Sequence, residues 1–138
     1  MAGPGDLPAC LAIRAAVFIA EQQVPREREL DGLDDECRHY LAEMDGRPVA
    51  TARVRPLHGQ AKIQRVAVLK DARGKGIGRA LIAEILADMR ADPDCAEAYI
   101  ESQLSAVAFY ESLGFTAYGE VFMDAGIQHR RLTAPLNG

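Results

Sequence analysis

Three segments of the chain carry apolar residues at the three- and four-residue spacing of a helix that buries one face. The first begins near Asp6 and runs to about residue 22 or 23. The second covers residues 76–90 and has the clearest stripe, formed by Ile77, Leu81, Ile82, Ile85, Leu86 and Met89. The third covers residues 105–113 and is followed by Gly114, a residue typical of helix C-termini.

Shorter apolar runs predict strands at residues 39–44, 49–57, 63–68, 98–100, 115–124 and 129–135. The dipeptide Asp45-Gly46 is a strong hairpin signal, and Ala125-Gly126 separates the last two strands. Residues 26–38 are dominated by charge and have no clear period, so we expect a loop with at most a short helix. This order of helices and strands predicts a mixed α/β layer architecture.

Length and composition narrow the class of protein. A chain of 138 residues, 49% of them hydrophobic, fits one domain, residues 1–138, with a real core. The net charge of −4 and the absence of a basic run argue against nucleic acid as a partner. No apolar run approaches the ~18 residues of a membrane span, and the first residues do not read as a secretory signal, so we expect a cytoplasmic protein.

Cysteine and histidine give no sign of a metal centre. Cys10, Cys37 and Cys95 lie far apart, form no C-x-x-C pair and are odd in number. We therefore expect free thiols, with neither a disulfide framework nor a zinc site. The spacing of the three histidines predicts no metal site either, and His39 and His58 read as structural residues at strand edges.

A glycine-rich turn, Arg73-Gly74-Lys75-Gly76-Ile77-Gly78-Arg79, joins the strand at 63–68 to the long helix. Glycines allow successive amides to point into one concavity, and the helix N-terminus adds unpaired N–H groups and a positive dipole end. Arg73, Lys75 and Arg79 add full charges at the rim. The turn therefore predicts a site for a diphosphate or similar anion; the alternative is a flexible turn before an ordinary helix.

The spacing of this turn excludes the two commonest nucleotide loops. A Walker loop requires G-x-x-x-x-G-K-[ST], but Lys75 is followed by Gly76. A dinucleotide fingerprint that starts at Gly74 requires glycine where Arg79 stands, and one that starts at Gly76 requires glycine where Leu81 stands. A nucleotide-binding module is therefore disfavoured.

Two motifs resemble the GNAT superfamily of N-acetyltransferases. Residues 73–78 resemble its Q/R-x-x-G-x-G/A signature, and residues 105–115, Ser-Ala-Val-Ala-Phe-Tyr-Glu-Ser-Leu-Gly-Phe, resemble its A-x-x-F-Y-x-x-x-G-F element. Residues 17–22, followed by Pro25, Glu29, Asp31 and Asp34, resemble the ElaA/YjcF-like branch. The resemblance covers nearly the whole chain.

The resemblance implies a mostly antiparallel central sheet flanked by helices. Only Met1–Gly5 precede the first helix, so either the first edge strand usual in the family is short or missing, or this sequence starts downstream of the true start. A bare sheet edge invites pairing with another chain, so a homodimer is a further expectation.

The resemblance also implies direct transfer of an acetyl group from acetyl-CoA, without a metal, to an amine of a small molecule or peptide in a ternary complex. The residues it assigns to coenzyme A are Val66, Ala67 and Val68 on the strand, Arg73, Gly74, Lys75, Gly76, Ile77, Gly78 and Arg79 in the turn, and Ser105. A non-catalytic acyl-CoA-binding or regulatory domain is the alternative.

Tyr110 and His129 are the candidate catalytic residues. Tyr110 stands where the family places a tyrosine that protonates the leaving thiolate; by itself it also reads as a core aromatic residue. Many members carry a basic glutamate where this chain has Gln64, which cannot act as a base. His129 follows Gly126-Ile127, as a histidine does in ElaA-like proteins, and an imidazole that titrates near neutrality suits proton abstraction. The alternative is a partly exposed strand histidine.

Acidic residues gather in one stretch, at Glu21, Glu27, Glu29, Asp31, Asp34, Asp35 and Glu36. A solvated loop explains them most simply. The sharper hypothesis is that some of them face the cleft and favour a cationic amine, with Glu21 and Asp31 as the first candidates.

Overall fold

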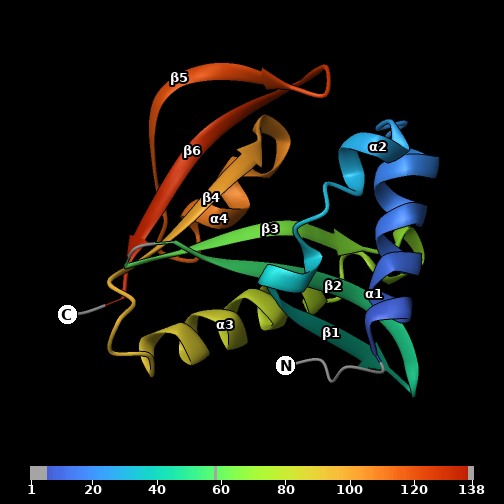
Figure 1. The fold of residues 1–138 in the computed structure, drawn as a ribbon, viewed down its shortest axis with the longest axis horizontal. Coiled ribbons are helices and arrows are strands. Elements are labelled where there is room, and N and C mark those ends of the chain that lie inside the picture. Colours follow the sequence, from blue (N-terminus) through green and yellow to red (C-terminus); the bar gives the residue numbers. More distant parts are fainter. Residues whose placement is uncertain (1–5, 58, 137–138) are drawn as a thin grey trace.

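The computed structural model describes residues 6–57 and 59–136, so the predictions for His58 and for Met1–Gly5 lie outside it. Six strands form one sheet in the order β1-β2-β3-β4-β6-β5 (Figure 1). Their bounds are β1 Arg38–Met44, β2 Arg47–Leu57, β3 Gln60–Val68, β4 Glu97–Gln103, β5 Thr116–Asp124 and β6 Ile127–Pro135. All neighbouring pairs are antiparallel except β3 and β4. The predicted mixed, mostly antiparallel sheet is confirmed, and in the described residues β1 is an edge strand.

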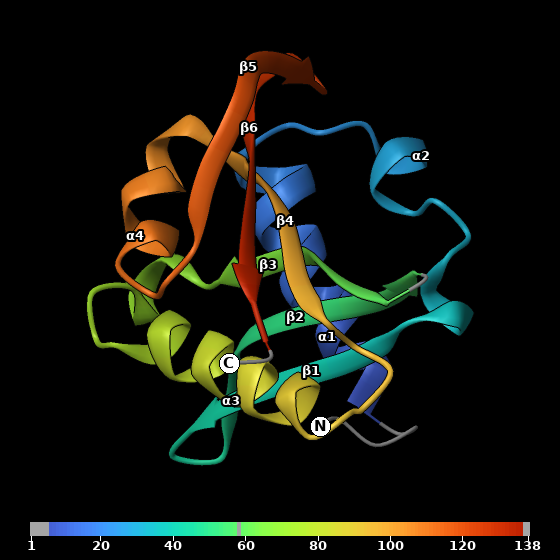
Figure 2. The same ribbon diagram turned by 90° about the vertical axis from the view of Figure 1, so that its left-hand side faces the viewer.

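Two helices cover opposite faces of the first three strands (Figures 1 and 2). Helix α3, Ile77–Arg90, buries its predicted apolar stripe in the main core together with Tyr40 of β1. Helix α1, Leu7–Arg14, and the turns after it pack a second cluster against Leu41, the next residue of β1. Successive strand residues point to opposite faces, so one strand supplies both clusters.

The sheet splits between β3 and β4. The two strands pair in parallel from Gln60↔Glu97 to Ile63↔Ile100 and no further. Beyond that point β4 keeps pairing with β6 as far as Gln103↔His129, while β3 keeps pairing with β2 as far as Val68↔Ala50. Figure 2 shows the two strands turning apart. The result is a fork: within the described part of the chain, residues 64–68 of β3 have no strand partner on the side that faces β4.

A β-bulge lies at the apex of this fork. Thr51 pairs with Ala67 and Arg53 pairs with Gln64, so one residue of β2 faces both Arg65 and Val66. Arg65 has a φ of +53°, the left-handed conformation that L-residues rarely adopt. Bulges bend a strand and redirect its side chains. Here the bend occurs where β3 leaves β4.

The helical predictions need two corrections. The first helix has the predicted extent but is not α-helical throughout: α1 ends at Arg14 and continues directly as a π-helical segment, η2, Ala15–Glu21. The N–H of Gln22 donates to the Val17 carbonyl over 3.0 Å, five residues back. The third helix is shorter than predicted, because it starts with a 3₁₀ turn, η5, Leu104–Ala106, and α4 covers only Val107–Glu111. Apolar spacing cannot distinguish these tighter and wider turns from an α-helix.

The charged stretch contains two short helical turns, α2 Arg26–Glu29 and η3 Asp34–Glu36, as expected for a loop with a short helix. A further 3₁₀ turn, η4 Lys70–Ala72, precedes the glycine turn. All three cysteines are free, as predicted. Within the described residues, no helix is long and apolar enough to cross a membrane, and no cluster of potential ligands could hold a metal.

Candidate active site

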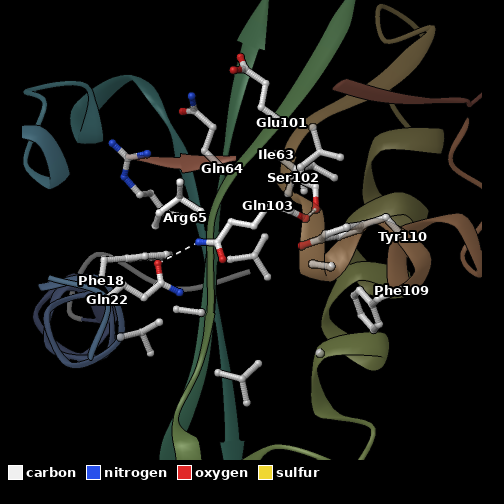
Figure 3. Close-up of a pocket in the computed structure, with 18 of the residues that line it drawn as sticks. Phe18, Gln22, Ile63, Gln64, Arg65, Glu101, Ser102, Gln103, Phe109 and Tyr110 are labelled. Carbon is white, nitrogen blue, oxygen red and sulfur yellow. Dashed lines mark hydrogen bonds between the residues drawn. The ribbon is translucent and has the colours of Figure 1, made fainter. Parts of the chain in front are cut away.

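A cleft of about 830 Å³ follows the fork between β3 and β4. One wall consists of residues 66–68 of β3, residues 72–74 and 76–79 of the glycine turn, and the aromatic pair Phe109 and Tyr110; we call it the glycine-turn wall. The other wall is formed mainly by polar side chains from β3, from α2 and from the segments that follow η2 and α2; we call it the arginine wall. These residues are Gln22, Glu29, Asp31, Gln64 and Arg65, with Phe18 of η2 beside them. Figure 3 shows Tyr110 and Phe18 on opposite sides of β3.

Backbone geometry shapes the glycine-turn wall. Gly74 and Gly76 both have a φ of +77°, and no neighbouring atom would meet a Cβ at either position, so backbone conformation and not space requires glycine there. The first helical hydrogen bond of α3 runs from the Ala80 N–H to the Gly76 carbonyl over 3.1 Å. The amides of residues 77–79 precede it and have no partner within the helix. This is the arrangement that binds anions at helix N-termini.

Gly78 has a different role in the same wall. A Cβ at this position would lie 3.6 Å from Phe109 Cζ and 3.7 Å from Val68 Cγ2. Both are ordinary van der Waals distances, so an alanine would fit here without displacing either neighbour. The start of α3 thus lies beside both Val68 of β3 and Phe109 of α4.

The side chains of the turn do not all face the cleft. Arg73 donates to both Glu21 carboxylate oxygens over 2.7 Å each and to the Val68 carbonyl over 3.0 Å. The hydrogen bond from Arg73 lowers the pKa of Glu21, and the pair links η2 to the turn. Arg79 donates to the Ser112 hydroxyl over 2.9 Å. Lys75 is exposed and does not line the cleft.

Tyr110 of α4 is buried, with 5% of its surface exposed, and lines the cleft. Its ring packs edge-on against Phe109 at 5.0 Å and Phe115 at 5.8 Å between ring centroids. Among the described residues its hydroxyl has no hydrogen-bond partner. Burial raises the pKa of this phenol, so Tyr110 stays protonated at neutral pH and can donate a proton.

His129 lies on β6 opposite Gln103, is buried and lines the same cleft. Its Nδ1 lies 2.7 Å from the Ile127 carbonyl oxygen. A carbonyl only accepts, so Nδ1 carries the proton of this bond, and Nε2 holds the lone pair in the neutral ring. The neutral imidazole can therefore accept a proton at Nε2.

Gln64 lines the cleft, and its side chain is held by a hydrogen bond from the buried Arg53. Arg53, which has no exposed surface, donates from Nε to the Gln64 Oε1 over 3.1 Å. The same guanidinium donates to Asp31 and Asp34. The side-chain oxygen of Gln64 is thus engaged, and its amide nitrogen is the group that it can offer to a ligand.

The predicted acceptor residues Glu21 and Asp31 are both held by arginines. Glu21 pairs with Arg73 and does not line the cleft, whereas Asp31 lines it. The Arg53 hydrogen bonds hold the pKa of Asp31 well below its usual range. That these two residues bind a cationic amine stays a prediction.

The fork brings together most of the residues that the sequence suggested. Those that line one cleft are Asp31, Val66, Ala67, Val68, Arg73, Gly74, Gly76, Ile77, Gly78, Arg79, Tyr110 and His129. Ser105 does not join them: it is exposed in η5, outside the cleft. Sequence reasoning missed Arg65, Gln22 and Gln103, although an arginine inside an apolar strand was a signal for the first.

Gln22 and Gln103, which both line the cleft, are joined by a hydrogen bond. The Gln103 amide donates to the Gln22 side-chain oxygen over 2.9 Å (Figure 3). These residues are 81 positions apart in the chain: Gln22 directly follows η2 and Gln103 ends β4. No local pattern in the sequence predicts such a contact.

Comparisons with known proteins agree with this geometry. A family model described as an acetyltransferase (GNAT) domain matches residues 10–134. YjcF of Bacillus subtilis, an uncharacterized N-acetyltransferase, is 36% identical over 121 residues, which cover 87% of this chain and 86% of YjcF.

Solved structures have the same fold. The structure of a putative N-acetyltransferase from Lactobacillus plantarum superposes with a TM-score of 0.89 at 26% identity, over 97% of this chain and 93% of that one. Escherichia coli ElaA superposes with a TM-score of 0.85 at 29% identity, over 96% of this chain and 92% of ElaA. The similarity to both YjcF and ElaA supports the branch that the sequence indicated.

Proposed function

Since the chain belongs to the GNAT acetyltransferase family and is therefore an acyltransferase, we propose that it transfers an acetyl group from acetyl-CoA directly to an amine of a small molecule or peptide in a ternary complex. The observation that carries the proposal is the fork between β3 and β4. The cleft along this fork is lined by both the glycine turn and Tyr110. An extended ligand that needs backbone partners and an anion site at one end fits this shape.

Acetyl-CoA fits the glycine-turn wall in three respects. The pantetheine arm can pair with the backbone of Val66, Ala67 and Val68, because that side of β3 has no strand partner. The pyrophosphate can lie on the amides at the start of α3. The thioester then comes to rest between the bulge at Arg65–Val66 and Tyr110.

Acetyl-CoA supplies an activated acyl carbon as a thioester. In our proposal His129 removes a proton from the acceptor amine through Nε2, and the amine nitrogen forms a bond to the acyl carbon. The backbone N–H of Val66 stabilises the negative charge on the carbonyl oxygen. As the C–S bond breaks, Tyr110 gives its proton to the sulfur, and solvent exchange later restores both residues.

Thermal shift measures the donor part of this proposal. Acetyl-CoA should raise the melting temperature in a concentration-dependent way, whereas ATP and NAD at the same concentrations should not, because only the former reaches along the fork. Equal shifts by all three ligands would show general anion binding and contradict the assignment of the fork to coenzyme A.

Thiol release measures the transfer itself. With a panel of amines, at least one acceptor should accelerate CoA release above the rate of hydrolysis. Binding of acetyl-CoA without release for any amine would support the alternative, a non-catalytic acyl-CoA-binding domain.

A further inference from the structure

The arginine wall presents hydrogen-bond donors to the cleft, although acidic residues outnumber basic ones in the segment that builds it. Six charged side chains form one network behind and along this wall: Arg14, Glu29, Asp31, Asp34, Arg53 and Arg65. Their three positive and three negative charges cancel. A neutral network does not by itself attract a cation, so the group that it exposes decides which ligand it favours.

Two carboxylates of this network that line the cleft, Asp31 and Glu29, are engaged by partners within the protein. Each oxygen of Asp31 accepts two hydrogen bonds: Oδ1 from the Leu33 N–H and Arg53, Oδ2 from Arg53 and Arg65. Four bonds exhaust the lone pairs of a carboxylate. Glu29 pairs with Arg14, and only 2% of its side chain is exposed. Asp31 therefore has no open position for an ammonium group, and Glu29 is nearly inaccessible to one.

The arginines of the network differ in how tightly they are held. Arg53 lies 2.6 Å from Asp31 and is 0% exposed, and Arg14 lies 2.7 Å from Asp34 and is 1% exposed. Arg65 donates to Asp31 over 3.2 Å and to the Glu29 carbonyl over 3.4 Å, and it is 24% exposed. Arg65 lines the cleft, whereas Arg14 and Arg53 do not, so it is the cation that the network presents to the cleft.

The bulge and Gln64 place two kinds of donor beside each other. The left-handed φ of Arg65 belongs to the bulge at the fork apex, next to the Val66 amide. Figure 3 shows Arg65 and Gln64 side by side, with Arg65 on the Phe18 side of β3. Because Arg53 engages the Gln64 oxygen, Gln64 offers its NH₂ group. A guanidinium and an amide NH₂ match the two oxygens of a planar carboxylate.

The other charged residues that line the cleft favour a ligand group with a single negative charge. Glu27, Glu101 and Asp124 also line the cleft, and Lys62 is paired with Glu101 over 2.8 Å. These carboxylates would repel a phosphate dianion more strongly than a carboxylate, and they tolerate an ammonium group on the same ligand.

We propose that the acceptor amine also carries a carboxylate, which Arg65 binds with help from the Gln64 amide, so that Arg65 determines acceptor specificity. This inference rests on the proposed function, since it assigns the acceptor to the class of amino acids and amino-acid-like compounds. Asp31 then acts as a positioning residue that holds Arg65.

The test compares amino acids with their own carboxamides, which differ only in the charged group. Glycine, β-alanine and γ-aminobutyrate are each assayed against the matching amide for kcat/KM, corrected for the fraction of unprotonated amine. For the acid of best-fitting length the wild type should favour the acid by about 10- to 100-fold, the range of one charge-assisted contact. The Arg65→Gln variant should lose this preference mainly through KM, and Arg65→Lys should keep part of it.

One control variant and one second test variant complete the experiment. Arg90→Gln removes an exposed arginine at the far end of α3 and should leave the acid-to-amide ratio unchanged. Gln64→Glu keeps the shape but adds a negative charge, so it should lower the ratio below that of the wild type, and it carries the test if Arg65→Gln does not fold. The acetyl-CoA dissociation constant should stay the same in every folded variant.

The outcomes separate the two claims. Wild-type enzyme that uses the amides as well as the acids, or Arg65→Gln enzyme that keeps the wild-type ratio, overturns the carboxylate site while acetyl transfer stands. Absence of CoA release with every acid and every amide overturns the proposed function, and this inference with it.

Discussion

The two walls of the cleft are made in different ways. The glycine-turn wall depends on backbone: a fork in the sheet, left-handed glycines, and amides that precede the first bond of α3. The arginine wall depends on side chains from β3, α2 and nearby turns, and it is held by ion pairs and hydrogen bonds to residues far away in the chain, such as Arg53 of β2 and Gln103 of β4. A backbone site recognises one invariant ligand, whereas a side-chain site can change its ligand by a few substitutions.

This contrast explains why the donor is easier to assign than the acceptor. The glycine turn leaves a local signal in the sequence, its glycine spacing. The residues that we propose select the acceptor make contacts that exist only in the folded chain. Four variants or conditions separate the contributions of the two walls, in order of decreasing expected effect.

Tyr110→Phe tests the side chain of the glycine-turn wall that we propose takes part in the chemistry. Removal of the phenolic proton should lower kcat by about 100- to 10,000-fold, the usual contribution of a general acid. The ring packing against Phe109 and Phe115 should survive, so stability and acetyl-CoA affinity should hardly change. Tyr118→Phe, at an exposed tyrosine, is the matched control. Full activity of Tyr110→Phe would return Tyr110 to a purely structural role.

Arg53→Met tests the arginine wall as a structural unit. The substitution removes a buried guanidinium from Asp31, Asp34 and Gln64, and loss of one buried partner costs about 3–5 kcal/mol. The melting temperature should fall by about 10 °C or more. Arg47→Met breaks the exposed pair with Asp71 and should cost less than about 1 kcal/mol. Similar losses in both variants would mean that burial of the network contributes nothing.

Gly76→Ala and Gly78→Ala test the backbone character of the glycine-turn wall. Alanine at 76 must adopt a φ of +77°, which costs about 1–2 kcal/mol, so acetyl-CoA should bind about 10-fold more weakly. Alanine at 78 keeps its helical φ and meets Phe109 at an ordinary 3.6 Å, so its effect should be small. Titration calorimetry measures both, and equal affinities would show that the left-handed turn is dispensable.

Acid should weaken the arginine wall first. Hydrogen bonds from Arg53 depress the folded-state pKa of Asp31, so below the unfolded value of about 4 the unfolded chain binds more protons than the folded one. Stability contributed by this pair is present above that pH and is lost as the pH falls further. The loss should be on the order of 1–2 kcal/mol in urea titrations between neutral and acidic pH. Asp31→Asn should reduce this acid dependence; an unchanged dependence would assign it to other groups.

The sequence predicted the fold and the glycine-turn wall well because both rest on local patterns. Apolar spacing located every strand and the whole of α3, and glycine spacing located the turn. It failed where hydrogen-bond geometry decides, as in the π-helical η2 and the 3₁₀ start of α4. It could not show that Arg53 donates a hydrogen bond to the Gln64 oxygen, or that Arg73 pairs with Glu21. These contacts depend on strands and helices that meet only in the folded chain.

The central claim is that the glycine-turn wall binds acetyl-CoA and the arginine wall does not. Calorimetric titration of acetyl-CoA into the wild type and into the Gly76→Ala and Arg65→Gln variants tests it most directly. The account predicts one binding site per wild-type chain, about 10-fold weaker binding in Gly76→Ala, and wild-type affinity in Arg65→Gln. Absence of acetyl-CoA binding to the wild type, or equal weakening in the two variants, would contradict it.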